Sequence, residues 1–431
     1  MRLPNQRVLW AVSLGHTAND MFMSLRSVLL VFISAYMMPM TGGQIGLAVS
    51  AVELTGALSQ PFFGLLADRT GGRLLGSIGV AWTVSFMLLA MLVVTLGGSY
   101  WMMVIPLALA GLGSGAFHPV GSMHAVDAEP QRAARNAAFF FLFGQLGLGL
   151  GPALAGLLLD RAHTDYNSFF GAALGPAFPR LFIERGSVTP LFVLALIALP
   201  AALLMALTIP NRTAYFAHHP RTSTQASTPR APLNKRAFAV FGAAVALRSL
   251  SAISVITFTS LIFQLKGWTP AQYGLLVSVF WVASGLSGMV FGTLGDRYDS
   301  RRVVMLSLLI AAPFIFLLPD LTGIFAFLAM IIIGAMGGSH SLVVVLAQNM
   351  LPGRRGFASG AILGFIFASG ALGNLVMGSL IDALGPATTY QIVAGVTLVG
   401  GLLWLLLPNP RRPRPLPADS APQEAVAPAR A

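Results

Sequence analysis

Long apolar segments follow one another along the chain, separated by short stretches that contain charged residues, Pro or Gly. A helix needs about 20 apolar residues to span a bilayer, and twelve segments come close to this length. The predicted spans cover residues 8–38, 44–66, 74–96, 100–126, 135–159, 188–209, 238–265, 271–294, 303–318, 321–346, 356–381 and 388–407. Their apolar residues run in blocks and do not alternate with polar ones, as the strands of a transmembrane barrel would. The pattern predicts an all-α membrane protein with twelve transmembrane helices.

The composition supports this prediction and excludes several other classes of protein. Of the 431 residues, 56% are hydrophobic and 9% charged, whereas soluble domains carry about 25% charged residues. This excludes a soluble enzyme and a protein with one anchor and a large exposed domain. The absence of cysteine excludes disulfides, cysteine–metal sites and thiol nucleophiles. Neither lysine, Lys235 or Lys266, stands in a phosphate-binding G-K-[ST] loop, which disfavours a transport ATPase.

The basic residues predict the orientation of the spans, because Lys and Arg collect in short cytoplasmic loops. If both termini are cytoplasmic, six basic residues are exceptions: Arg161, Arg180, Arg185 and Lys266 on the outer side, and Arg26 and Arg248 within spans. The other 20 of the 26 then lie on the cytoplasmic side. The net charge of +12 is therefore a topology signal, and nucleic acid is not an expected partner.

Composition also predicts the domain boundaries. Residues 211–237 lack an apolar run and are rich in Pro, Ser, Thr and Arg, which is typical of a linker. They separate an N-terminal six-helix half (residues 1–210) from a C-terminal half (residues 238–408). The segment 409–431 is rich in Pro, Ala and Arg and is predicted to be a disordered cytoplasmic tail.

The two halves are similar in sequence. When the second half is aligned on the first, His118 matches His340 and Asp160 matches Asp382 in one register. In a slightly shifted register, the segment GLLADR at 64–69 matches GTLGDR at 292–297. Two halves in the same orientation require an even number of spans in each, which agrees with six and six.

The loop after the second span, GLLADRTGGR at 64–73, resembles the cytoplasmic signature of the major facilitator superfamily. The segment GTLGDRYDSRR at 292–302 resembles its second copy, without the later glycine. The resemblance implies two six-helix halves that rock around a central site. It also implies a cytoplasmic latch, whose residues here are Gly64, Asp68, Arg69, Arg73, Asp296 and Arg297. The alternative is a basic loop that only sets the topology.

A narrower resemblance extends over residues 8–408. The segments GHTAND (15–20), GLGSGAFHP (111–119) and AQNMLPGR (347–354) resemble the bacterial fosmidomycin resistance group. This resemblance implies proton-coupled export of a small anionic or amphipathic compound. Two acids typical of that group are replaced by Val120 and Asn349. If coupling persists, Asp20 and Glu53 are the remaining candidates for the proton-carrying acid.

The fifth span carries small residues at regular spacing: Gly147, Gly151, Pro152 and Gly156. They resemble the glycine–proline motif of drug–proton antiporters, although Ala155 stands where a glycine is usual. Close helix packing through small residues explains the same spacing, and both interpretations stay open.

Four charged residues fall well inside spans: Asp20, Arg26, Glu53 and Arg248. Charges at this depth are costly and usually functional. Because helical residues turn by about 100° each, His16, Asn19, Asp20 and Arg26 occupy a sector of about 120°, which we expect to face the central path. Glu53 is expected to pair with Arg26 or with Asp20, and an ion pair that only fixes packing is the alternative. Arg26 and Arg248, one in each half, suit an anionic or zwitterionic substrate.

The fourth span has a polar stripe of Ser114, His118 and Ser122, and His340 is the repeat copy of His118. Histidine titrates near neutrality, so these side chains fit either proton transfer or a structural hydrogen bond. No three ligands stand together at local spacing, and no metal site is predicted.

The predicted function is proton-coupled efflux of a small anionic or amphipathic compound, such as a fosmidomycin-like drug, by alternating access. One alternative is an importer or uniporter of an organic anion, and another is a non-transporting receptor or scaffold. An enzyme is not predicted, and neither is a cofactor. We expect a monomer, multi-pass in the bacterial cytoplasmic membrane, whose partners are its substrate, protons and lipids.

Overall fold

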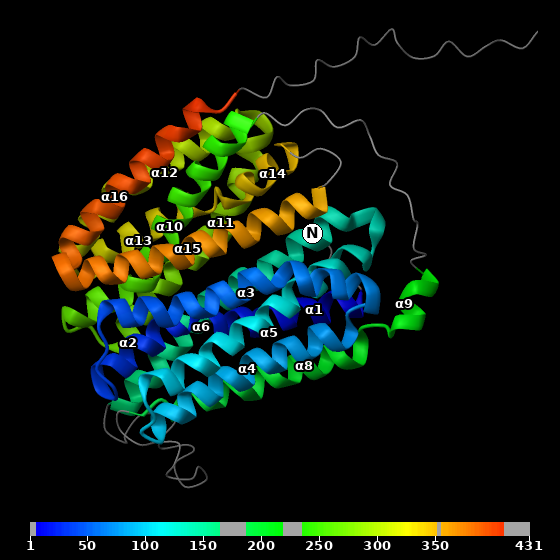
Figure 1. Cartoon of the computed structure of the whole chain (residues 1–431), viewed down its shortest axis with the longest axis horizontal. Coiled ribbons are helices and arrows are strands. Elements are labelled where there is room, and N and C mark those ends of the chain that lie inside the picture. Colours follow the sequence, from blue (N-terminus) through cyan, green and yellow to red (C-terminus); the bar gives the residue numbers. More distant parts are fainter. Residues whose placement is uncertain (1–5, 164–186, 219–234, 351–354, 409–431) are drawn as a thin grey trace, which may run out of the picture.

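The structure is a computed structural model that describes residues 6–163, 187–218, 235–350 and 355–408. The predicted disordered tail, 409–431, lies outside this part of the chain. Within it, every element is an α-helix or a short 3-10 helix (Figure 1). The α-helices are α1 (Arg7–Ser24), α2 (Arg26–Tyr36), α3 (Gly42–Thr70), α4 (Arg73–Thr95), α5 (Tyr100–Asp127), α6 (Ala133–His163), α8 (Ala195–Thr208), α9 (Arg212–His218), α10 (Lys235–Leu265), α11 (Pro270–Arg297), α12 (Ser300–Leu317), α13 (Gly323–Gly337), α14 (His340–Met350), α15 (Arg355–Leu384) and α16 (Pro386–Leu403). The predicted all-α class is confirmed.

In the part of the chain that the structure describes, twelve helical segments have the length of a membrane span. Eleven of those in the described residues are long and apolar enough to cross a membrane by length and composition. The twelfth is α3, which has 29 residues and a more polar sequence. Two predicted spans are each divided into two helices: α1 and α2 meet at Leu25, and α13 and α14 meet at Gly338 and Ser339. The predicted linker contains the short helix α9, and α10 begins at Lys235, slightly earlier than predicted.

Matching caps start the second span of each half. Thr41 and Gln44 form a capping box at the start of α3, and Thr269 and Gln272 form the same box at the start of α11. In such a box the threonine side chain accepts from the backbone three residues on, and the glutamine side chain accepts in return. The two boxes are related by the same offset along the chain as the two signature loops. The internal duplication therefore extends to the local chemistry of the helix ends.

The two halves lie side by side, and two pairs of helices join them. In the N-terminal half, α1 packs on α6, and α5 packs on α3 and α4. In the C-terminal half, α16 packs on α10 and α12, and α13 packs on α11. Across the halves, α3 runs along α15, as Figure 1 shows, and α6 packs against α11. These two seams determine how the halves meet.

Small residues let the helices approach closely at both seams. A Cβ atom added to Gly46 would lie 2.3 Å from the carbonyl oxygen of Asn374, and one added to Gly156 would lie 2.3 Å from that of Pro270. Real Cβ atoms do not approach an oxygen this closely, so any larger residue would push the helices apart. Both seams therefore depend on glycine.

Hydrogen bonds reinforce the seam between α3 and α15. The Asp382 carboxylate accepts from the backbone N–H groups of Gly42 and Gly43, at 2.6 and 2.7 Å. These N–H groups begin α3 and have no partner within their own helix, and the helix dipole favours a negative charge at this end. Further along the seam, the Ser50 hydroxyl donates to the Ala371 carbonyl at 2.6 Å. The start of α3 is thus capped by the opposite half.

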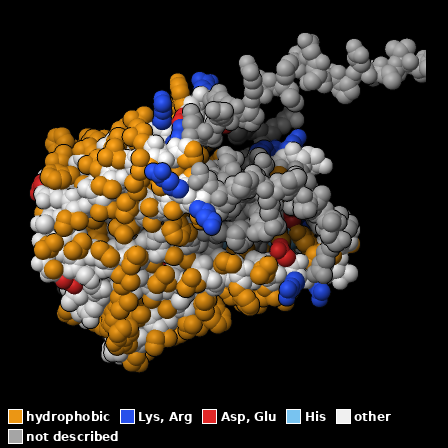
Figure 2. Space-filling view, turned by 45° about the horizontal axis from the view of Figure 1, so that its top comes forward, with side chains coloured by type: hydrophobic (Ala, Val, Ile, Leu, Met, Phe, Trp, Pro, Cys, Tyr) orange, Lys and Arg blue, Asp and Glu red, His pale blue; other side chains and the backbone are white. Residues whose placement is uncertain are grey.

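The outer surface is largely hydrophobic. Figure 2 shows apolar side chains over much of the visible face. Many large apolar residues are exposed along the helices, among them Leu196, Leu207 and Met289. Such a surface fits lipid and does not fit water.

We predict that Gly151→Ala destabilises the protein and that Gly242→Ala, the matched control, does not. A Cβ at Gly151 would lie 2.3 Å from the Met21 carbonyl oxygen on α1, whereas one at Gly242 meets nothing within 4 Å. Overpacking of this kind costs about 1–3 kcal/mol. The midpoints of thermal unfolding in detergent measure the difference, and equal midpoints for the two variants would contradict the packing described here.

Candidate functional site

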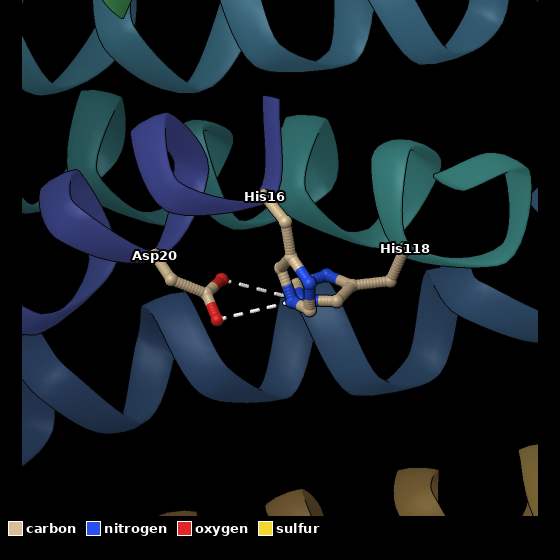
Figure 3. A group of neighbouring side chains, drawn as sticks. All are labelled: His16, Asp20 and His118. Atoms are coloured by element: carbon tan, nitrogen blue, oxygen red, sulfur yellow. Dashed lines mark ion pairs between the residues drawn. The ribbon is translucent and has the colours of Figure 1, made fainter. Parts of the chain in front are cut away.

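Asp20 is the centre of a polar cluster between α1 and α5. Its Oδ2 lies 3.2 Å from His16 Nε2, one turn earlier on α1, and its Oδ1 lies 3.3 Å from His118 Nε2 on α5 (Figure 3). The Asn19 side-chain amide donates to both Asp20 Oδ1 and Ser114 Oγ, at 3.0 Å each. These five residues, predicted separately on two spans, form one cluster.

Backbone carbonyls fix the orientation of both imidazole rings. His16 Nδ1 lies 2.9 Å from the carbonyl oxygen of Phe140, and His118 Nδ1 lies 2.8 Å from that of Ser114. A carbonyl oxygen only accepts, so each Nδ1 must carry the hydrogen. In the neutral ring the proton-free Nε2 then faces the Asp20 carboxylate.

Glycines on α6 make room for this cluster. A Cβ added to Gly144 would lie 2.4 Å from the His16 ring, and one added to Gly147 would lie 2.5 Å from the Thr17 carbonyl oxygen. The ring of Phe140 stacks on His16 with the centroids 4.1 Å apart. The close fit of α6 on α1 therefore buries the part of the cluster that α1 carries: His16 is 2% exposed and Asp20 is 7% exposed.

Arg26 and Glu53 form a second cluster, which also contacts the other half. Arg26 Nη2 donates to Glu53 Oε1 at 2.7 Å. The Asn374 amide on α15 donates to Glu53 Oε2 at 3.0 Å. Both side chains of the ion pair are largely shielded from solvent, at 13% exposure for Arg26 and 6% for Glu53. Of the two predicted partners, Glu53 takes Arg26 and not Asp20, and its second oxygen binds across the seam.

Arg248 stands apart from these clusters. It is 5% exposed, it donates from Nη2 to the Gly337 carbonyl at 3.0 Å, and its Nε is buried without a hydrogen-bond partner. Among the described residues no acidic side chain pairs with it. His340 is near enough for the charge of Arg248 to act on its imidazole ring. The predicted pair of substrate-binding arginines is therefore unequal: Arg26 is neutralised by Glu53, and Arg248 is not neutralised.

The remaining residue of the polar stripe does not join the cluster. The Ser122 hydroxyl donates to the carbonyl of Pro119, within its own helix, at 3.1 Å. His340 is on α14, in the other half, and among the described residues no hydrogen bond or ion pair joins it to His118.

The first signature loop is held by its neighbours. Gly71, whose φ of 76° suits glycine, ends α3, and its carbonyl lies 2.8 Å from His124 Nε2. Arg73 donates from Nε to the Ala206 carbonyl at 2.7 Å. Asp68 is exposed and makes no hydrogen bond or ion pair with another described residue. Arg69, Asp296 and Arg297 do have interaction partners.

The second loop ends in a tight acid–arginine contact. Asp299 caps α12 by accepting from the backbone of Arg301 at 3.0 Å. The Arg301 guanidinium also bonds to this carboxylate, and that bond lowers the pKa of Asp299. Arg301 in turn donates to the Leu407 carbonyl. This loop therefore binds the end of the last span.

The glycine–proline motif of α6 serves two interfaces. Gly147 and Gly151 face α1, where Cβ atoms would collide with the carbonyls of Thr17 and Met21. Gly156 and the carbonyl of Pro152 face α11, where both approach Gly274. The packing interpretation has direct contacts in its favour. Gly64 of the signature loop has more space, because a Cβ added there would lie 3.6 Å from the Cβ of Pro119, an ordinary contact distance.

The sequence did not predict every residue of these clusters. Asn374, Gly144 and the Phe140 carbonyl were missed. Asn374 left a signal, because it is an amide inside an apolar span. No metal site was predicted, because no three ligands stand at local spacing in the sequence. The fold nevertheless brings ligand atoms of His16, Asp20 and His118 within 4.8 Å of one another. Local spacing failed here because the third ligand comes from another helix.

Comparison with known proteins agrees with this architecture. The family model of the Major Facilitator Superfamily matches residues 12–265 and 237–430. The chain is 30% identical over 417 residues to the fosmidomycin resistance protein of Escherichia coli, covering 94% of this chain and 93% of that protein. It is 22% identical over 380 residues to the quinolone resistance protein NorA of Staphylococcus aureus, covering 85% and 88%.

Solved structures show the same fold. A mutant of the nucleoside transporter NupG matches with a TM-score of 0.71 at 14% identity, covering 93% of this chain and 99% of that one. A bacterial homologue of the human lysosomal transporter Spinster, in an inward-facing and occupied conformation, matches with a TM-score of 0.70 at 15% identity, covering 93% and 94%. The protein thus falls in the class of multi-pass secondary transporters. The chain belongs to the Major Facilitator Superfamily.

We predict that Glu53→Ala lowers the stability and that a double variant, Arg26→Met with Glu53→Gln, recovers most of it. The single change leaves Arg26 buried without a counter-charge, which costs about 3–5 kcal/mol. The double change removes both charges and keeps an oxygen that accepts from Asn374. Thermal unfolding midpoints in detergent test this, and a double variant no more stable than Glu53→Ala would refute it.

Proposed function

We propose that this protein exports a small anionic or amphipathic compound in exchange for protons. The observation that carries the proposal is the position of Glu53, an intramembrane acid whose two oxygens bind the two halves. Proteins named for resistance to fosmidomycin and to quinolones are among its relatives, which supports a drug-like cargo and outward transport.

A coupling group must experience different surroundings in the two states of the transporter. The recorded partners of Asp20 all belong to α1 and α5, within one half, so rigid rocking of the halves leaves those contacts unchanged. The bond between Glu53 and Asn374 crosses the halves, and rocking at this seam breaks it. Of the two candidate acids, Glu53 is therefore the coupling group.

The proposed cycle follows from this bridge. In the described state a charged Glu53 accepts from both Arg26 and Asn374, and the halves touch along α3 and α15. When the halves part there, an outer proton neutralises Glu53, and the neutral acid holds Arg26 more weakly. Return of the halves and release of the proton inside restore the bridge. The empty, deprotonated carrier is then held in place until a substrate binds.

Arg248 is the proposed contact for the anionic group of the substrate. It is buried, it has no acidic partner among the described residues, and its Nε lacks a hydrogen-bond acceptor. A buried cation in this condition favours an incoming carboxylate or phosphonate oxygen, which satisfies both needs. Arg26 is already paired and takes part only when Glu53 is protonated.

The proposed setting is the bacterial cytoplasmic membrane, with a monomer whose termini face the cytoplasm. The asymmetry of the basic residues supports this orientation. It makes the start of α3, capped by Asp382, the outer end of the seam, and it places both signature loops inside.

We predict that an inward-directed flow of protons drives fosmidomycin out of proteoliposomes, and that Glu53→Gln abolishes this dependence. Glutamine keeps the shape and one accepting oxygen but cannot titrate, so exchange of fosmidomycin across the membrane without a gradient should persist. Asp20→Asn is the matched control and should retain the response to the gradient. Labelled fosmidomycin and an internal pH dye report both fluxes.

Three outcomes would contradict this account in different ways. A wild-type flux of fosmidomycin that does not change with the proton gradient refutes the coupling to protons. Movement of fosmidomycin in the same direction as protons makes the chain an importer. Loss of coupling in Asp20→Asn with normal coupling in Glu53→Gln moves the proton site to Asp20.

We also predict that Asp68→Asn abolishes transport and leaves insertion intact. This acid ends α3 beside the arginines of the signature loop, where the superfamily has its latch. A latch that only one state engages fails without its charge, whereas a topology signal depends on the arginines. Substrate flux and membrane yield are compared with wild type, and unchanged flux refutes the latch.

A further inference from the structure

We propose that His16, Asp20 and His118 form a binding site for a divalent transition-metal ion of the zinc type. These three residues are not needed by the coupling mechanism proposed above. Their ligand atoms come from α1 and α5 and lie within 4.8 Å of one another. Figure 3 shows both imidazoles directed at the carboxylate.

Both histidines are set to act as ligands through Nε2. Each Nδ1 hydrogen is directed at a backbone carbonyl, that of Phe140 for His16 and that of Ser114 for His118. This leaves the Nε2 lone pair of each neutral ring pointing at Asp20. Metal-binding histidines in proteins have this arrangement, in which the second nitrogen donates to a carbonyl or carboxylate and so fixes the tautomer.

The cluster has too few hydrogen-bond donors for its acceptors. When both rings are neutral, the carboxylate oxygens face two proton-free nitrogens at 3.2 and 3.3 Å. Among the described side chains, the Asn19 amide is the recorded neutral donor to the carboxylate. Acceptors that face one another repel unless a proton or a metal ion lies between them. A metal ion of charge +2 supplies that charge at one point.

The spacing fits a tetrahedral ion. Zinc–nitrogen and zinc–oxygen bonds of about 2.0–2.1 Å at tetrahedral angles place neighbouring ligand atoms about 3.3 Å apart. The two histidine–carboxylate separations, one to each oxygen of Asp20, are close to this value, and one ligand atom from each of the three residues lies within 4.8 Å of the others. The remaining adjustment falls on His118, whose side chain is 26% exposed against 3% for His16. Three protein ligands leave the fourth position for water or an anionic oxygen.

The ligand set also selects among metals. Two imidazoles with one carboxylate suit zinc, cobalt and nickel, whereas magnesium and calcium prefer oxygen ligands alone. A bound ion would tie α1 to α5 and so stabilise the folded protein by mass action. Zinc should therefore raise the thermal midpoint, and magnesium should not.

The test uses full-length protein with an affinity tag free of histidine, stripped with EDTA and purified in detergent. With zinc chloride we expect about one ion per chain by elemental analysis, and a higher unfolding midpoint. His118→Gln should lose most of this zinc. Loss of a group that only supports a ligand lowers metal affinity about 10–100-fold, and loss of the ligand His118 itself should lower it by more. The control is a double variant, His218→Gln with His219→Gln, which lacks the two adjacent histidines of the linker. This variant should bind zinc as the wild-type protein does.

A second measurement does not depend on the folding of a variant. Cobalt added to the stripped wild-type protein should give the visible absorption of a four-coordinate ion, and zinc should remove it. Zinc stoichiometry unchanged in His118→Gln, or lost only in the linker variant, would overturn the proposal. So would a midpoint that responds to pH but not to zinc. No gradient or substrate enters these measurements, so they stand or fall separately from the transport proposal.

Discussion

The buried ion pair of Arg26 and Glu53, together with the amide of Asn374, is the interaction on which the rest of this structure depends. Charges at membrane depth are costly unless partners neutralise them and satisfy their hydrogen bonds. Arg26 and Glu53 neutralise each other, but the second oxygen of Glu53 finds its donor in the other half. The free energy of this pair is therefore linked to the contact between the halves.

The packing of the seam makes that contact possible. Gly46, Ser50 and Glu53 lie on one face of α3, because residues three or four apart share a helix face. Gly46 lets the backbone of α15 approach, Ser50 bonds to a carbonyl of α15, and Glu53 meets Asn374. Asp382 then caps the start of α3 from the same opposing helix. Close approach and polar pairing along one seam support each other.

The sequence predicted the architecture well, because a membrane span is determined by local composition. The apolar blocks, the asymmetry of the arginines and the repeated loop together indicated twelve helices in two halves. Chemistry that needs side chains from more than one helix was harder to predict. Helical spacing placed His16 and Asp20 on one face of the first span, but nothing local showed that His118 completes the group. The partner of Glu53 was predicted as one of two options, and Asn374 was missed because its neighbours in sequence give no hint of the seam.

Single glycines show the same limit. The spacing of Gly147, Gly151 and Gly156 fitted either an antiporter motif or close packing. The structure records the contacts: two of these glycines meet α1 and one meets α11. One motif thus supports both the polar cluster of the first half and the second seam between the halves. A residue pattern can predict a close approach, whereas only the fold shows which helix approaches.

The central claim is that the charge on Glu53 holds the halves together, and a distance measurement tests it most directly. The chain has no native cysteine, so spin labels can be attached at Ala35→Cys on α2 and Ala383→Cys on α15, which are both exposed. In lipid nanodiscs, double electron–electron resonance should show a short distance between the two labels at high pH. A growing population of longer distances should appear as the pH falls. In Glu53→Gln the distribution should not change with pH. A pH response identical to wild type in this variant would contradict the account.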